Sequence, residues 1–261
     1  MTESSVSKAA RRIVETMQRQ YGAPNTMGLV SEAHFAHLDL PAYRSFRTAM
    51  EAEGFRYLGD LEIPEASRSP TTLLARTMIR GMISEDGVVA SDYYHAKPRV
   101  WRYVKVLATG LRNLRFVDAP RTFARGMHTR HCTDFATEFD DGTSLVTSNA
   151  QAASMISSPP TIETTFSPWG TPPSVLLQAH RTRVEEILRA KTQAKPVVIA
   201  SLSDLLQMHK RQSTQKAAYR ATVQWITKAE LQGMSAGRPE IADLVFAEVQ
   251  KLLDSGQSVE P

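Results

Sequence analysis

One seven-residue segment, HTRHCTD, brings two imidazoles, a thiol and a carboxylate close together: His128, His131, Cys132 and Asp134. These are donor types that bind zinc and that transfer protons in enzymes. Their spacing, however, matches neither a zinc finger nor a metalloprotease helix. If the segment continues as a strand, Cys132 and Asp134 share one face while His131 lies on the other. A metal site built from this stretch alone is therefore not favoured, and no metal ligand is predicted.

Cys132 is a candidate nucleophile, with His128, His131 or His180 as its general base. Its thiol would need a lowered pKa, which a helix N-terminus or a cationic neighbour such as Arg130 supplies. A lone cysteine in a sheet is more often a packing residue. The chain has no Gly-x-Ser-x-Gly elbow and lacks both common Gly-rich phosphate loops. A hydrolase or transferase that uses these residues is thus an alternative hypothesis, and the sequence leaves catalysis undecided.

A polar triplet and a histidine on a helix form the favoured hypothesis for a ligand site. Thr147, Ser148 and Asn149 end a strand that should otherwise bury apolar side chains, and buried polar groups need partners. His180 lies on the apolar stripe of a later helix, where a core histidine with satisfied hydrogen bonds is the simplest interpretation. If the strand end and this helix meet, the four side chains would line a small-ligand pocket.

The stretch from residue 97 to residue 130 is strongly basic, with Asp118 as its only acid. Aromatic side chains are interleaved with the basic ones, a composition that can follow a phosphate backbone and stack on bases. The residues that would bind a polyanion or nucleic acid are Arg99, Arg102, Arg112, Arg115 and Arg125. Residues 32–65 are acidic by comparison, so the two stretches are equally well explained as mutually attracting surfaces of one fold. Nucleic acid is therefore kept as an alternative partner but is not favoured.

The composition is that of a globular protein with 42% hydrophobic and 22% charged residues and a formal net charge of +4. Its 261 residues are enough for one or two hydrophobic cores. No window approaches the roughly eighteen apolar residues of a membrane span, and the first residues lack the apolar run of a signal peptide. The single cysteine excludes an internal disulfide and suits a reducing compartment. We therefore predict a soluble cytoplasmic protein without a membrane span.

Two Asp-Gly dipeptides flanked by β-forming residues predict hairpins, because glycine readily takes the positive φ of a tight turn. The first is Asp86-Gly87, and the second is Asp141-Gly142. The strands expected from these turns and from period-two patterns span residues 55–63, 72–84, 88–94, 161–166 and 197–200 and the two halves of 135–149.

Helical periodicity and capping residues predict helices on both sides of this run of strands. The expected helices are residues 6–21, residues 41–53, and four that begin at Thr171-Pro172, at Ser203, at the capping box Thr227 to Glu230 and at Pro239. Residues 99–118 fit both periods, and we favour a helix to about Leu107 followed by a turn at Gly110 and a short strand.

This order of elements argues for the α+β class, with a predominantly antiparallel sheet of about six strands packed by helices and a helical C-terminal part. The expected divisions are an N-terminal amphipathic helix and linker at 1–25, an α+β core domain at 26–200 and a helical subdomain at 201–261. The N-terminal helix should dock on the protein body, on a protein partner or on a second copy. The leading functional hypothesis is a non-catalytic domain that binds a small ligand or a protein, and the sequence identifies no cofactor.

Overall fold

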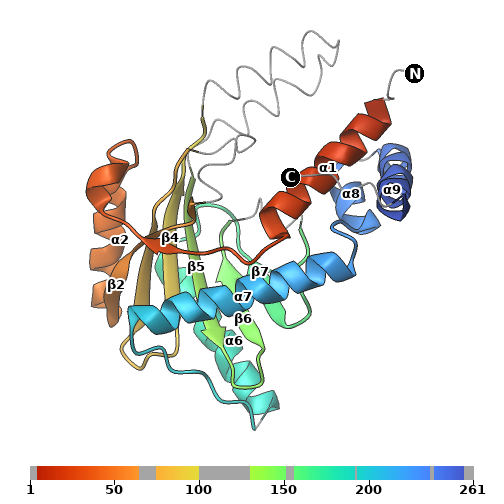
Figure 1. Ribbon diagram of the computed structural model, residues 1–261. Helices are drawn as coiled ribbons and strands as arrows, with labels where there is room; N and C mark the ends of the chain where they lie inside the picture. The colour runs from red at the N-terminus through yellow and green to blue at the C-terminus, as the bar shows by residue number, and fades with distance from the viewer. Residues whose placement is uncertain are drawn as a thin grey trace.

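The computed structural model of this chain describes residues 5–64, 75–99, 130–150, 156–191, 193–235 and 238–255. A seven-stranded sheet forms its centre, with the strands in chain order (Figure 1). Neighbouring strands are antiparallel, except that β6 and β7 run parallel. The strands are β1 Gly28–Leu29, β2 Phe55–Glu62, β3 Ile79–Ser84, β4 Ala90–Ala96, β5 Arg130–Glu138, β6 Ser144–Ser148 and β7 Ile162–Phe166. The predicted α+β class with a mostly antiparallel sheet is confirmed.

Helices cover both faces of the sheet. On one face lie α2 (Leu40–Ala52) and α6 (Pro173–Ala190), while α7 (Leu202–Thr222) crosses the other face (Figure 1). A short 3-10 helix, η1 (Glu32–Phe35), precedes α2. The remaining helices are α1 (Ser5–Tyr21), α8 (Lys228–Met234) and α9 (Pro239–Asp254). In the part of the chain that the structure describes, no helix is long and apolar enough to cross a membrane.

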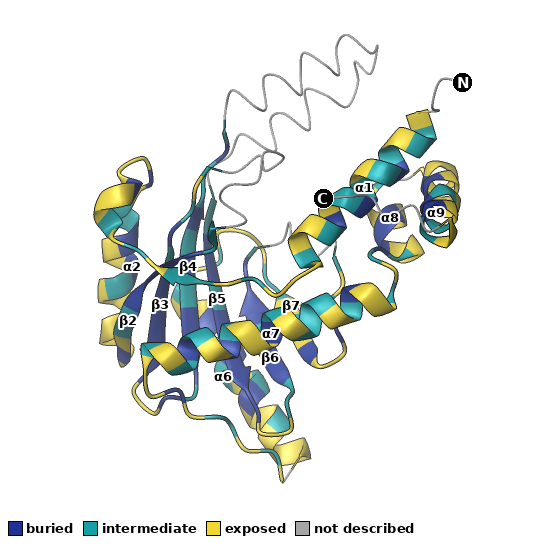
Figure 2. Ribbon diagram, in the orientation of Figure 1, coloured by how far each residue is buried: buried dark blue, intermediate teal, exposed yellow. Residues whose placement is uncertain are grey.

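The face under α2 and α6 holds the largest hydrophobic core. Side chains of a strand alternate between faces, so Tyr93 of β4 and Phe135 of β5 point into this core together. Phe46 of α2 stacks on Tyr93 with ring centroids 4.4 Å apart. Figure 2 shows the result as a buried central sheet beneath helices whose outer sides are exposed.

The opposite face is packed by the first half of α7. Leu205 and Met208 are fully buried in one cluster with Ile83 of β3. A glycine permits this close approach, because a Cβ at Gly81 would lie 2.7 Å from the Cδ2 atom of Leu205. The beginning of α7 is therefore fixed directly against the sheet.

The N-terminal helix α1 docks on the C-terminal helices. Its Ala10 and Val14 are fully buried in one cluster with Leu231 of α8 and Val249 of α9 (Figure 1). The predicted docking of this helix on the protein body is thus observed. A protein partner or second copy at α1 stays a prediction, as do the expected divisions of the chain after residues 25 and 200.

Several expected boundaries are shifted: the strand expected at 88–94 is Ala90–Ala96, and α6 begins at Pro173 with Pro172 as its cap. Two further differences have a clear physical cause. The strand expected at 72–84 begins only at Ile79, because the carbonyl of Met78 accepts a 2.6 Å hydrogen bond from the Tyr43 hydroxyl. The cap of α7 is Ser201 and not Ser203, because Ser201 and Asp204 exchange the two side-chain-to-backbone bonds of a capping box.

Residues 197–200 run beside the sheet without forming the expected edge strand. Val197 donates its N–H to the carbonyl of Glu138, and Ile199 donates to that of Gly87, so the segment bonds to two different strand ends. The segment of ambiguous periodicity at 99–118 lies outside the described residues, apart from residue 99.

Both predicted Asp-Gly hairpins are present. Gly87 has φ +73° and Gly142 has φ +79°, values that favour glycine. They differ in their surroundings: a Cβ at Gly87 would lie 2.8 Å from Val198 Cγ1 and 3.0 Å from the Ile199 carbonyl oxygen, whereas a Cβ at Gly142 would enter open space.

This difference predicts unequal costs for the same substitution. Gly142→Ala should lose about 1 kcal/mol of unfolding free energy, because an L-residue resists a positive φ. Gly87→Ala should lose about 2–4 kcal/mol, because steric overlap with the 197–200 segment is added. Urea unfolding of the two variants beside the wild type measures both values. Equal losses would show that the first turn does not pack closely on that segment.

Candidate functional site

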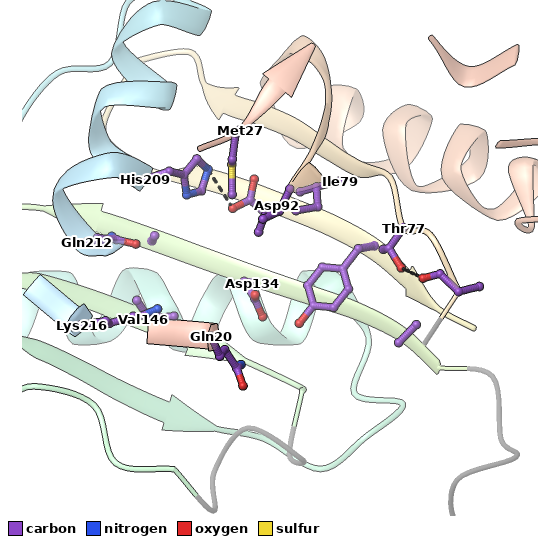
Figure 3. Close-up of a pocket in the computed structure, with 15 residues that line it drawn as sticks. Gln20, Met27, Thr77, Ile79, Asp92, Asp134, Val146, His209, Gln212 and Lys216 are labelled. Carbon is purple, nitrogen blue, oxygen red and sulfur yellow. Dashed lines mark hydrogen bonds and ion pairs between the residues drawn. The ribbon is translucent and has the colours of Figure 1, made fainter. Parts of the chain in front are cut away.

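The pocket of interest, here called the α7 pocket, is a cavity of about 450 Å³ between the sheet and the second half of α7. Gln20 of α1 and Met27 close one side of it (Figure 3). Its apolar wall consists of Met27, Ile63, Ala75, Ile79, Ala96, Ala136 and Val146. Its polar groups are Gln20, Thr77, Asp92, Tyr94, Asp134, His209, Gln212 and Lys216. The cavity thus has the mixed lining typical of sites for small organic ligands.

The polar half of the pocket arises from a change of composition along α7. The sheet-facing stripe of the helix begins with Leu205 and Met208, and it continues with His209, Gln212 and Lys216. These positions follow helical spacing, so the polar residues face the same sheet as the apolar ones. The beginning of α7, as far as Met208, therefore buries apolar surface, and the inward residues from His209 onward present polar groups to a cavity.

Two carboxylates face α7 from neighbouring strands. Asp92 of β4 and Asp134 of β5 are directly paired across the antiparallel ladder, so their side chains project from the same face. Like charges in such a pair repel one another at a Cβ separation of about 5 Å. Paired carboxylates of this kind need neighbouring cations or a proton.

The middle of α7 is held in place by contacts to the β5–β6 hairpin. Arg211 donates two hydrogen bonds to the Glu138 carboxylate at the end of β5. One turn later, Gln215 Nε2 donates to the Gly142 carbonyl at 2.9 Å. A bidentate Arg–carboxylate pair fixes orientation as well as distance. These bonds hold the intervening polar residues over Asp92 and Asp134.

His209 forms an ion pair with Asp92 across the pocket (Figure 3). Its Nε2 atom lies 3.2 Å from Asp92 Oδ2, and the two side chains are 12% and 14% exposed. Burial by itself lowers the pKa of His209, but the attraction of the Asp92 carboxylate outweighs burial, and the pKa is raised overall. The imidazolium form of His209 is therefore favoured.

Asp134 is less well compensated. Burial, together with the charge of Asp92, raises the pKa of its carboxyl to about 6, although Ser148 Oγ donates a 2.5 Å hydrogen bond that favours the carboxylate. The charges of Lys216 and His209 on α7 act in the opposite direction and favour the carboxylate, but burial in turn lowers the pKa of Lys216. Asp134 thus changes its protonation near neutral pH.

Three polar groups of the pocket lack partners among the described residues. The Oδ1 atom of Asp92 and the Nε2 atom of Gln212 are buried without a hydrogen bond. Gln212 is only 7% exposed, and it lines the cavity. Lys216 likewise makes no hydrogen bond or close ion pair within these residues. The pocket therefore offers one free acceptor and two free donors.

The four residues predicted to line a pocket are distributed over both faces of the sheet. Thr147 and His180 meet beneath α6, where both ring nitrogens of His180 are used: Nδ1 lies 3.0 Å from Thr147 Oγ1 and Nε2 lies 3.0 Å from Thr137 Oγ1. Ser148 faces the other way and reaches Asp134. Asn149 Oδ1 accepts from the backbone N–H of Thr133 at 2.8 Å. Of the four residues, only Ser148 contacts a residue of the α7 pocket, through its bond to Asp134, and none of the four lines the pocket itself.

The cysteine and histidines proposed for catalysis do not converge. Cys132 is buried and faces the α7 side, and burial raises the pKa of its thiol to about 11, which disfavours the nucleophilic thiolate. His131 lies on the opposite face, 2.6 Å from the Tyr93 hydroxyl through Nδ1. His180 lies on that face also, under α6, and His128 is outside the described residues. Within the described parts of the chain, no group of three or more His, Cys, Asp or Glu residues could hold a metal ion.

The proposed polyanion surface lies almost wholly outside the described residues. Of its five arginines the structure describes only Arg99, and that residue has an interaction partner. The others are Arg102, Arg112, Arg115 and Arg125. Binding of nucleic acid or another polyanion through this stretch stays a prediction.

Sequence reasoning did not identify Asp92, His209, Gln212 or Lys216 as site residues. A signal for them exists in the pattern, because an acid at an inward strand position and polar residues on the inward stripe of a helix both contradict core packing. No protein-family model matches the chain, and no curated protein or solved structure matches it either. The assignment of function therefore depends on the geometry of the site.

The raised pKa of Asp134 predicts how its removal changes stability with pH. The folded protein holds a proton on Asp134 up to about pH 6, while the unfolded chain releases it near 3.8, so the carboxylate destabilises the fold above pH 6 and not below pH 4. Asp134→Asn should raise the unfolding free energy by about 1–3 kcal/mol at pH 7.5 and by much less at pH 4. Urea unfolding at both pH values measures this, and a pH-independent difference would contradict it.

For His180 we expect stability to change with pH in the opposite direction. Burial, followed by the charge of Arg183, lowers its pKa to about 3 from an ordinary value of 6.5. The unfolded chain therefore binds a proton that the folded protein refuses, and stability should fall by up to ~4 kcal/mol as the pH drops from 6.5 towards 3. His180→Gln should be less stable than the wild type at pH 7.5, because the glutamine amide cannot make the bonds to both Thr137 and Thr147. Its unfolding free energy should, however, fall less steeply as the pH is lowered. Urea unfolding across this pH range measures both proteins. If the unfolding free energy falls equally steeply with pH in the variant and the wild type, His180 is not the source of the acid sensitivity.

Proposed function

We propose that this protein is a non-catalytic binding protein for a small organic ligand, which it holds in the α7 pocket. The observation that carries the proposal is the set of unpartnered polar atoms, Asp92 Oδ1 and Gln212 Nε2, buried in a cavity with an apolar wall. A buried donor or acceptor without a partner costs about 1–3 kcal/mol. A bound ligand that supplies the missing partners would recover this free energy.

Comparison with the other buried charges of the fold supports this interpretation. Arg80 donates two hydrogen bonds to Asp60 and a third to Glu32, each 2.8 Å long. Arg220 is paired with Glu230 at 2.8 Å and is 1% exposed. Structural ion pairs in this protein are thus saturated by several bonds, as burial of charge requires. The charges of the α7 pocket are not.

The proposed location of the protein is the cytoplasm. The supporting observation is its single cysteine, Cys132, which is buried and free, as suits a reducing compartment. Acid–base catalysis in the same pocket is a second candidate, favoured by the pKa of about 6 for Asp134, which suits proton transfer near neutral pH. Conversion of a bound compound, followed by NMR, would distinguish an enzyme from a binding protein.

A ligand screen with paired variants tests the proposal. Amino acids, amines, organic acids, sugars, nucleosides and organic phosphates are screened for a rise in melting temperature. At 100 times its Kd, a true ligand should add about 2.7 kcal/mol of stability. Lys216→Met should abolish this gain, because it removes a donor from the pocket.

Lys210→Met is the matched control, because Lys210 lies on the exposed side of the same helix and outside the α7 pocket. It makes the same change of charge and should preserve the ligand-induced gain. If no class of compound stabilises the protein, or if both variants respond alike, the α7 pocket is not a ligand site.

A further inference from the structure

Building on the proposed function, we infer that the ligand of the α7 pocket is a small zwitterion of the amino-acid kind, with an ammonium, a carboxylate and an apolar side group. The polar atoms that the fold leaves without partners are of two opposite kinds. One is a carboxylate oxygen, and the others are an amide and an ammonium. A ligand that satisfies all of them must carry both a donor and an acceptor.

The ammonium of the ligand is recognised by Asp92. One oxygen of this carboxylate, Oδ2, faces the imidazole of His209 at 3.2 Å. The other, Oδ1, is buried and has no partner among the described residues. An ammonium hydrogen bond to a carboxylate is charge-assisted and is stronger than a neutral one. The orientation of Asp92 by His209 leaves Oδ1 as the acceptor for the ligand.

The carboxylate of the ligand is recognised by Gln212 and Lys216. These residues are four apart on α7, so their side chains lie next to one another on the same face, with Cβ atoms about 5–6 Å apart. The amide of Gln212 and the ammonium of Lys216 both donate, and both line the pocket. The two oxygens of one carboxylate have enough lone pairs to accept hydrogen bonds from both Gln212 and Lys216.

The balance of charge in the pocket favours a ligand without net charge. Asp92 faces the cation His209, and Asp134 is influenced by the cation Lys216, so the acids and bases are equal in number. A singly charged ligand would leave one charge uncompensated in a partly dehydrated cavity, which is costly. A zwitterion adds one charge of each sign and keeps the balance.

The apolar wall of the pocket is the reason to expect an apolar side group on the ligand. Met27, Ile79 and Val146 line the cavity between its charged residues, and Ala136 lines it as well (Figure 3). The cavity volume of about 450 Å³ is larger than an ammonium and a carboxylate fill, and it accommodates an aliphatic or aromatic side chain as well. Leucine, methionine and phenylalanine are therefore the appropriate probes.

Isothermal titration calorimetry of the full chain with leucine and two matched analogues tests the inference. The analogue 4-methylpentanoate lacks the amine, and 3-methylbutylamine lacks the carboxylate. Leucine should bind about tenfold or more tighter than either, because each analogue leaves a charged hydrogen bond unmade. Methionine and phenylalanine show whether the wall accepts other side groups.

Two variants assign the two ends of the ligand. Asp92→Asn should weaken leucine about tenfold but should not weaken 4-methylpentanoate, because that analogue has no ammonium for Asp92 and is itself repelled by the Asp92 charge. Gln212→Leu should weaken leucine and leave 3-methylbutylamine unchanged. Because the two variants alter opposite ends, a folding defect in one does not remove the test, and circular dichroism verifies that each is folded.

The outcomes separate this inference from the proposed function. If sugars, organic phosphates or either single-charge analogue bind in the pocket as tightly as leucine or tighter, the zwitterion is wrong but the ligand site stands. If leucine, methionine and phenylalanine all fail to bind, the inference is also overturned. The ligand site itself is overturned only if every class in the screen fails, or if Lys216→Met and Lys210→Met respond alike to a compound that binds.

Discussion

The close contact between α7 and the sheet is the constraint on which the site depends. Leu205 lies over Gly81, where even a single Cβ atom would be 2.7 Å away. Because a helix is rigid, fixing Leu205 also fixes Lys216, about 16 Å farther along the axis. The bonds of Arg211 to Glu138 then set the height of the helix above β5. The polar residues of α7 are thus held near the sheet by contacts they do not make themselves.

This constraint explains why the pocket keeps a set of charges that the core would otherwise reject. Asp92 and Asp134 are paired across two strands, so neither can move away without disturbing the ladder. His209 and Lys216 are kept opposite them by the helix. Each charge is only partly compensated, and the resulting shifts in pKa have opposite directions for Asp134 and Lys216, as burial demands of an acid and a base.

Local signals in the sequence predict the local features of the fold. The Asp-Gly turns at Gly87 and Gly142 and the capping box at Thr227 are correct, because each depends only on residues a few positions apart. The start of β3 is not predictable in the same way, since it depends on a hydrogen bond from Tyr43, which is 35 positions from Met78. The extended segment at 197–200 matches a strand in pattern, but its partners are set by tertiary packing.

The pocket is harder to predict, because it combines segments that are distant in sequence. In the sequence Asp134 stands next to His131 and Cys132, yet its neighbours in the pocket come from β4 and α7. The inward stripe of α7 changes from apolar to polar between Met208 and His209, and this change indicates a polar site. The sequence does not show, however, which strands lie beneath the helix. Only the register of β4 against β5 brings Asp92 and Asp134 together.

Two histidines differ in how far their surroundings use the available hydrogen-bonding positions. Thr137 donates its hydroxyl to the Val88 carbonyl, so it accepts from His180 Nε2–H, and Nδ1 of His180 is left to accept from Thr147. Every hydrogen-bonding position of that neutral ring is used, which leaves nothing for a ligand. His209 instead faces one carboxylate oxygen, and the second oxygen of that carboxylate has no partner among the described residues. The difference between the two histidines lies in the hydrogen-bonding capacity that their surroundings leave unused, and beside His209 this unused capacity is the Oδ1 atom of Asp92.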